Sequence, residues 1–253
     1  MAVIETLSFI LLMLINLFSL LSVIWAILVL FRIFNQEESD IKRVFKNTFI
    51  LFSIATIFLM LGEWTWSYYV YILGSDPYPS IGDLFYVLGY LFEAGGFIYL
   101  VVVSYNASKN KEKLRGWMSG ALIIAVGASF YLLNWLIIPF HEWGSSLEAM
   151  LDLYYPIASS ILFVSTIPSY LLFRGLKIEK PLLLIALSAL FGFMGDFLFS
   201  YYSWNEIYGV IGILSDFFYT INYLLLFLGL VLFARLFGSK KKYNASSDKP
   251  LAE

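Results

Sequence analysis

Cysteine is absent from the 253 residues, and charged residues are scarce. The missing thiols exclude disulfides, thiolate metal sites and cysteine nucleophiles. Only 13% of the chain is charged and 60% is hydrophobic, whereas soluble domains average about 25% and about 45–50%. This composition excludes a water-soluble enzyme, a nucleic-acid-binding protein and a disordered regulator, and it indicates an integral protein of the lipid bilayer.

Seven apolar stretches are long enough to cross a bilayer as helices, because a hydrocarbon core about 30 Å thick needs roughly 20 helical residues. They lie near residues 7–31, 48–73, 81–104, 117–139, 149–173, 181–203 and 208–236. The first is too long for a cleaved signal and carries Glu5 where a signal is basic, so we expect a retained helix. The predicted fold is all-α, with a seven-helix transmembrane domain over residues 1–239 and a basic polar tail over residues 240–253.

Basic residues predict the orientation of these helices. All sixteen lie in alternate connections or at the carboxyl end: Arg32, Lys42, Arg43, Lys46, Lys109, Lys111, Lys113, Arg115, Arg174, Lys177, Lys180, Arg235, Lys240, Lys241, Lys242 and Lys249. The other three connections contain none. By the positive-inside rule we expect a multi-pass protein of the cell membrane with its C-terminus in the cytoplasm and its N-terminus outside.

A gapless offset of 133 residues aligns two predicted helical hairpins. Between residues 62 and 96, ten positions are identical to those between 195 and 229, and Glu63 is matched by Asp196. Asp152 and Tyr155 repeat the D-x-x-Y spacing in between. We therefore expect one leading helix and three similar hairpins of the same orientation, unlike the inverted repeats of many transporters.

Six acidic residues fall inside the predicted helices, with no lysine or arginine expected within reach: Glu63, Asp83, Glu93, Asp152, Asp196 and Asp216. An acid at the middle of a bilayer costs about 2.5–3.5 kcal/mol on insertion scales. Three kinds of compensation are possible, namely protonation, a bound cation, or hydrogen bonds from hydroxyls and water.

Tyrosines extend these acids into stripes along two helices. At about 100° per residue, Asp83, Tyr86, Tyr90 and Glu93 share one face, and Asp216, Tyr219 and Tyr223 share another. If the stripes face inward, they line an acidic, aromatic pocket that opens to the outer side. The candidate ligand-binding residues are Glu63, Asp83, Tyr86, Tyr90, Glu93, Asp152, Asp196, Asp216, Tyr219 and Tyr223. Purely structural hydrogen bonding and catalysis are the alternatives, and we assign no catalytic residue, metal site or cofactor.

Other residue types allow two interpretations. Five tryptophans near the outer ends suit an aromatic belt or an aromatic wall for a ligand: Trp64, Trp66, Trp135, Trp143 and Trp204. Gly82, Gly89 and Gly96 recur every seven residues, which suits close packing against another helix of the chain or against a second copy. The sole histidine, His141, is expected to be a solvated loop residue.

The segment PSIGDLFYVLGYLFEAGGFIYL, preceded by GEWTWSYY, resembles the membrane regions ahead of bacterial GGDEF-type diguanylate cyclases and some sensor kinases. The matching residues are Pro79, Ser80, Asp83, Tyr86 and Tyr90. The resemblance implies a sensory module. Because the 253 residues hold neither a cyclase nor a kinase, we expect output through a separate membrane protein partner.

A second segment, FGFMGDFLFSYY with Gly195 and Asp196, is similar to the Gly-Asp helix of lysoplasmalogenase-like membrane hydrolases. That family also uses a downstream histidine, where this chain offers Asp216. We expect a non-enzymatic sensor or ligand-binding protein for a small cationic or aromatic ligand that enters from the outer side. An intramembrane lipid hydrolase with paired carboxylates and a structural subunit of a membrane complex are the alternatives.

Overall fold

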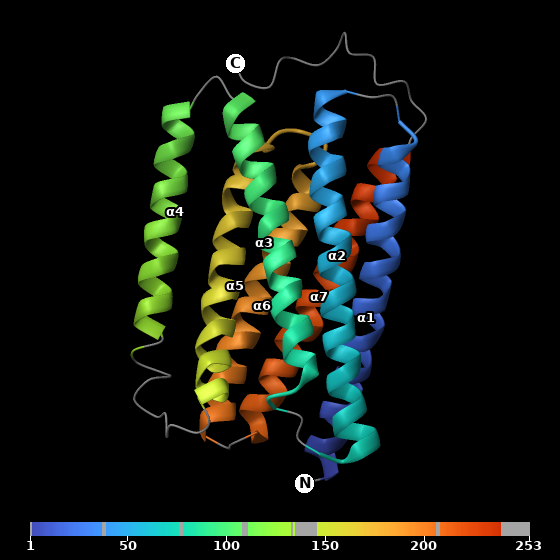
Figure 1. Cartoon of the computed structure of the whole chain (residues 1–253), viewed down its shortest axis with the longest axis vertical. Coiled ribbons are helices and arrows are strands. Elements are labelled where there is room, and N and C mark those ends of the chain that lie inside the picture. The colour runs from blue at the N-terminus through green and yellow to red at the C-terminus, as the bar shows by residue number, and fades with distance from the viewer. Residues whose placement is uncertain are drawn as a thin grey trace.

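Six of the seven long helices pack side by side in a closed ring (Figure 1). The computed structural model describes residues 2–36, 39–75, 78–107, 111–132, 134, 146–205 and 208–238. The helices are α1 (Ala2–Phe34), α2 (Asp40–Tyr68) with its π-helical extension η1 (Tyr69–Leu73), α3 (Ile81–Ala107), α4 (Lys111–Leu132), α5 (Ser146–Leu172), α6 (Glu179–Asn205) and α7 (Gly209–Gly238). Around the ring α1 packs on α2, α2 on α3, α3 on α5, α5 on α6, α6 on α7, and α7 on α1.

The predicted all-α class is confirmed for the described residues, which contain no strand. The six ring helices are each long and apolar enough to cross a membrane. The predicted fourth span, residues 117–139, is described as helix α4 only as far as Leu132. The predicted tail over residues 240–253 lies outside the described part of the chain.

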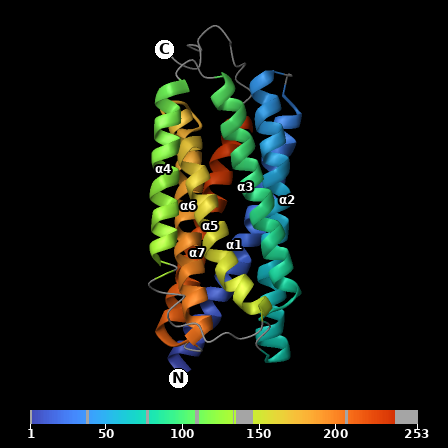
Figure 2. The same cartoon turned by 60° about the vertical axis from the view of Figure 1, so that its left-hand side comes forward.

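Helix α4 stands outside the ring, against α5 and with little contact to α3 (Figure 2). Only α5 of the predicted middle hairpin therefore takes a place among the ring helices. Both residues that suggested a third copy, Asp152 and Tyr155, lie on α5. Helix α4 turns large apolar side chains outward, such as Ile123 and Ile124. The three hairpins are thus not equivalent in their packing.

The described basic residues lie at one end of the bundle, the upper end in Figure 1, which we call the basic end. Its described members are Arg32, Lys42, Arg43, Lys46, Lys111, Lys113, Arg115, Arg174, Lys177, Lys180 and Arg235. The described residues at the opposite end include no basic residue. This separation of charge by ends agrees with the sequence pattern.

Polar side chains at the basic end donate hydrogen bonds to carbonyl groups that helices leave free at their C-termini. The guanidinium of Arg32 donates to the Ala234 carbonyl of α7. The amide Nε2 of Gln36 donates to the Phe237 carbonyl at 2.8 Å. The ammonium of Lys42 donates to the Gln36 carbonyl just beyond α1. The first two bonds fasten the end of α1 to the end of α7, and the third fastens the start of α2 to the end of α1.

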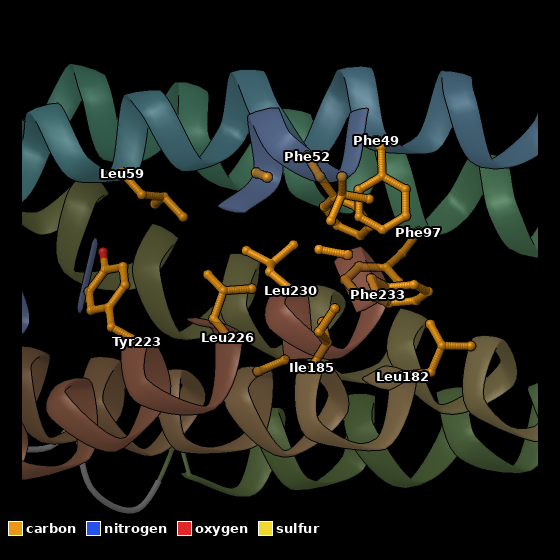
Figure 3. Packing of buried hydrophobic residues seen from close by; sticks show 14 of the residues in the cluster. Phe49, Phe52, Leu59, Phe97, Leu182, Ile185, Tyr223, Leu226, Leu230 and Phe233 are labelled. Carbon is orange, nitrogen blue, oxygen red and sulfur yellow. The ribbon is translucent and has the colours of Figure 1, made fainter. Parts of the chain in front are cut away.

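The half of the ring next to the basic end is filled by buried apolar side chains, several of them phenylalanines, as Figure 3 shows. We call this cluster the phenylalanine plug: Phe45, Phe49, Phe52, Phe97 and Phe233, all nearly fully buried. The ring centroids of Phe49 and Phe233 are 4.9 Å apart, and those of Phe52 and Phe97 are 4.7 Å apart. Inside a bilayer such packing stabilises by close van der Waals contact rather than by removal from water.

The glycine stripe of α3 faces α2 of the same chain. A Cβ atom on Gly89 would lie 2.6 Å from the Leu59 side chain, and one on Gly96 would lie 3.5 Å from the Thr48 carbonyl. These glycines therefore serve close packing within the chain, which decides between the two interpretations of the seven-residue spacing.

We predict that Gly89→Ala destabilises the protein and that Gly95→Ala, on the same helix, does not. A methyl group at 89 would overpack the contact with Leu59, at a cost of about 1–3 kcal/mol, whereas a Cβ on Gly95 meets nothing within 4 Å. Melting midpoints of the two variants in detergent measure the difference. Equal midpoints would contradict this packing.

Candidate ligand-binding site

A cavity of about 80 Å³ lies inside the ring, in the half opposite the basic end. All six ring helices contribute to its lining. It has room for a few water molecules. Nine of the ten predicted site residues line it: Glu63, Asp83, Tyr86, Tyr90, Glu93, Asp196, Asp216, Tyr219 and Tyr223. The tenth, Asp152, lies outside the lining. The two tyrosine stripes thus face a common space.

Asp196 of α6 accepts hydrogen bonds from two phenols. Tyr90 of α3 donates to Oδ2 at 2.6 Å, and Tyr219 of α7 donates to Oδ1 at 2.7 Å. The carboxyl group is only 2% exposed. Two phenol hydroxyls therefore take the place of water as hydrogen-bond donors to this acid.

Glu63 of α2 has the corresponding environment. Tyr223 of α7 donates to Oε1 at 2.8 Å, and Tyr86 of α3, whose ring lies against the neighbouring Gly62, is the second phenol beside this acid. Each of the two acids therefore has one phenol from its own hairpin and one from the other hairpin. The contacts connect α2 with α7 and α3 with α6 across the ring.

A glycine precedes each of these acids and makes the contact possible. The ring of Tyr86 lies 2.7 Å from where a Cβ atom of Gly62 would be, and the ring of Tyr219 lies 2.7 Å from that of Gly195. Because glycine has no side chain, the tyrosine can lie flat on the helix and reach the next residue. Both pairs are related by the offset of 133 residues.

Two further acids have phenol donors at the end of the cavity away from the basic end, which we call its mouth. Asp83 at the start of α3 accepts from the Tyr155 hydroxyl of α5. Asp216 of α7 accepts from Tyr208 and, at 3.1 Å, from Ser8 of α1. Burial and the neighbouring Asp216 carboxylate raise the pKa of Tyr208, so its hydroxyl stays a proton donor at neutral pH.

Asp152 lies beside the cavity and connects α5 with the α2–α3 connection. Tyr78 donates to its Oδ1 at 2.6 Å. Burial and the Asp152 carboxylate raise the pKa of Tyr78, which keeps this donor protonated. Pro156 has no N–H for the Asp152 carbonyl four residues earlier, and the Ser200 hydroxyl of α6 donates to that carbonyl at 3.0 Å instead.

Five of the six membrane acids are thus hydrogen-bonded by tyrosine, and Glu93 is the exception. Its side chain is 6% exposed and lines the cavity, but it accepts no hydrogen bond from any residue that the structure describes. Within the described ranges, no group of three or more His, Asp or Glu side chains could hold a metal ion.

Some participants were not identified from the sequence. Tyr78 lies outside the predicted helices and Tyr208 is the first residue of one, and both lie outside the helices of the structure, so helical spacing did not indicate them. Asn222 lines the cavity and accepts from Ser188 at 2.6 Å. It lies three residues after Tyr219, so the same helical stripe could have indicated it.

The tryptophans divide between the two interpretations. Trp66 lines the cavity, whereas Trp64 is 46% exposed on the outer surface of α2. Trp135, Trp143 and the side chain of Trp204 lie outside the described part, and so does His141.

No family model, curated protein or solved structure matches the chain. The resemblances to sensor membrane regions and to membrane hydrolases therefore stay predictions, and the geometry of the site is the main basis for a function.

We predict that Tyr90→Phe destabilises the protein by about 1–3 kcal/mol, because buried Asp196 loses one of its two donors. Tyr68→Phe, which removes the hydroxyl of a side chain that is 53% exposed, should leave stability unchanged. Melting in detergent compares the two variants. A loss of the same size in both would show that the phenol–carboxyl contact contributes nothing specific.

Proposed function

We propose that this chain is a multi-pass sensor or ligand-binding protein of the cell membrane, and that its cavity takes a small cationic ligand from the outer side. The observation that carries the proposal is a cavity walled by acids and phenols inside a closed helix ring. The lining includes five carboxyl groups and no lysine or arginine. Negative charge and aromatic faces together favour a cation.

The phenylalanine plug supports binding rather than passage across the membrane. The plug residues are buried to 4% exposure or less and fill the ring between the cavity and the basic end. Within this structure a ligand in the cavity has no polar path through the plug. A site that opens on one side suits a protein that reports on its ligand, with output through a separate membrane protein partner.

We also propose that the N-terminus is outside and the basic end is in the cytoplasm. The gathering of the described basic residues at one end supports this orientation. It places the mouth of the cavity, with Asp83 and Asp216, on the outer side of the membrane.

We propose further that the α2–α3 and α6–α7 hairpins are copies of one unit. The repeated contacts support this origin, since Gly62 with Tyr86 and Gly195 with Tyr219 have the same spacing and nearly the same geometry. Glu63 and Asp196 each accept a hydrogen bond from a tyrosine of the other hairpin, and this follows if two such copies lie face to face across the ring.

A lipid hydrolase with paired carboxylates receives less support from the site. A general base needs a carboxylate that is free to take a proton from water. Asp196, which carries the similarity to the membrane hydrolases, already accepts two phenol hydrogen bonds. Release of product from a lipid panel by the purified protein, abolished in Asp196→Asn, would favour the hydrolase.

Asp83→Asn with Asp216→Asn tests the proposed ligand class. The double variant removes two negative charges at the mouth, so organic ammonium ions should raise its melting midpoint less than that of the wild type. Glu5→Gln with Glu112→Gln removes two exposed acids outside the cavity and is the matched control. If amines and uncharged aromatic compounds all leave the wild-type midpoint unchanged, the binding function is wrong.

Single cysteines test the orientation, because the chain has no cysteine of its own. In intact cells, a membrane-impermeant thiol reagent should label Ser75→Cys in the α2–α3 connection and should leave Leu176→Cys in the α5–α6 connection unlabelled. Both positions are exposed. The reverse pattern would contradict the proposed topology.

A further inference from the structure

Glu93 differs from every other acid in the cavity lining. The other four each accept a hydrogen bond from a tyrosine hydroxyl, and Glu93 accepts none from the described residues. Buried polar groups are nearly always hydrogen-bonded, and an unpaired carboxyl group is costly to bury. A partnerless, 94% buried acid on a cavity wall therefore points to a partner that comes from outside the chain.

The packing of the ring does not require an acid at this place. In the 133-residue alignment Glu93 corresponds to Leu226 of α7, which is 4% exposed and lines the same cavity. A leucine thus fills the corresponding wall position. Glu93 is therefore a point at which one hairpin has an ionisable group and the other has an apolar side chain.

Glu93 lies at the floor of the cavity. It follows Ile81, the first residue of α3, by twelve residues, which is about 18 Å along the helix axis. One turn further, Phe97 is fully buried and packs on Phe52 in the phenylalanine plug. A group bound to Glu93 therefore sits deep in the membrane and against the plug.

The surroundings of Glu93 favour one organic cation rather than a metal ion. The described residues include no trio of His, Asp or Glu that could hold a metal. Tyr90, Tyr223 and Phe193 line the same cavity as Glu93. An ammonium group matches one carboxylate, donates N–H bonds to its oxygens, and is attracted by aromatic faces.

We propose that Glu93 anchors the ligand of this cavity, and that the ligand is a small primary alkylamine of a few heavy atoms, bound as its ammonium ion, which is the size that a cavity of about 80 Å³ can hold. The ammonium group pairs with Glu93 at the floor, and the short alkyl group lies among the aromatic side chains of the lining. This proposal rests on the proposed ligand-binding function and adds the anchoring residue and the ligand class.

Calorimetric titration of the full-length protein in detergent tests the anchor, with propylammonium as the probe and 1-propanol as an uncharged analogue of the same shape. The wild type should bind the ammonium probe at least tenfold more tightly than the alcohol. Glu93→Gln should weaken ammonium binding at least tenfold. Glu112→Gln, which removes an exposed acid at the basic end, should bind like the wild type.

Glu93→Leu separates loss of the anchor from loss of the fold. It reproduces the side chain at Leu226, so without ligand it should melt at or above the wild-type midpoint and should not bind the probe. If Glu93→Gln binds the ammonium probe within threefold of the wild-type affinity, Glu93 is not the anchor, and the binding function is unaffected. If the wild type binds the alcohol as tightly as the ammonium probe, recognition by charge is overturned.

Two further outcomes concern the wild type. Potassium or sodium chloride could stabilise the wild type but not Glu93→Gln, while the wild type does not bind the ammonium probe. That result would overturn the amine as the ligand in favour of an inorganic cation. Absence of binding to the ammonium probe would overturn this inference alone, because the proposed function fails only if the wider panel of amines and aromatic compounds also has no effect.

Discussion

This structure depends on one kind of contact, the hydrogen bond that a phenol hydroxyl donates to a carboxyl group. Acids inside a bilayer lack water, and no basic side chain lines the cavity to neutralise them. Tyrosine solves both problems, since its ring is apolar enough for the membrane and its hydroxyl is a strong donor to an acid. Asp196, with two such donors and 2% exposure, is the clearest case.

These contacts also specify which helices meet. Van der Waals packing of leucine and phenylalanine holds helices together in lipid but accepts many arrangements, whereas a hydrogen bond needs one register. Tyr90 with Asp196 joins α3 to α6, Tyr223 with Glu63 joins α7 to α2, and Asp83 with Tyr155 joins α3 to α5. The ring closes around polar pairs, and a small cavity remains where they converge.

Much of this arrangement could be predicted from the sequence. The length of the apolar stretches predicted six described helices to within a few residues at most ends, because membrane thickness sets helix length. The spacing of Asp83, Tyr86 and Tyr90 predicted an inward polar face, since helical periodicity alone determines which residues share a face. Nine of the ten candidate residues accordingly line one cavity.

Other features depend on contacts between distant segments. The identity of each partner, such as Tyr155 for Asp83, depends on the order of helices around the ring, which hydropathy does not contain. The position of α4 outside the ring could not be predicted for the same reason. Glu93 belonged to a predicted stripe, but what distinguished it from the other acids is that no residue in the described part of the chain donates a hydrogen bond to it.

The hydrogen bonds from tyrosines of one hairpin to acids of the other have a consequence for biosynthesis. Helices enter the membrane in the order in which the ribosome makes them, so Glu63 arrives long before Tyr223, and Tyr90 arrives before Asp196. Until α7 is inserted, Glu63 lacks a donor that it has in the finished protein. The last helix therefore completes the polar interior, and a chain truncated before α7 would expose an under-hydrated acid to the membrane-protein quality-control machinery.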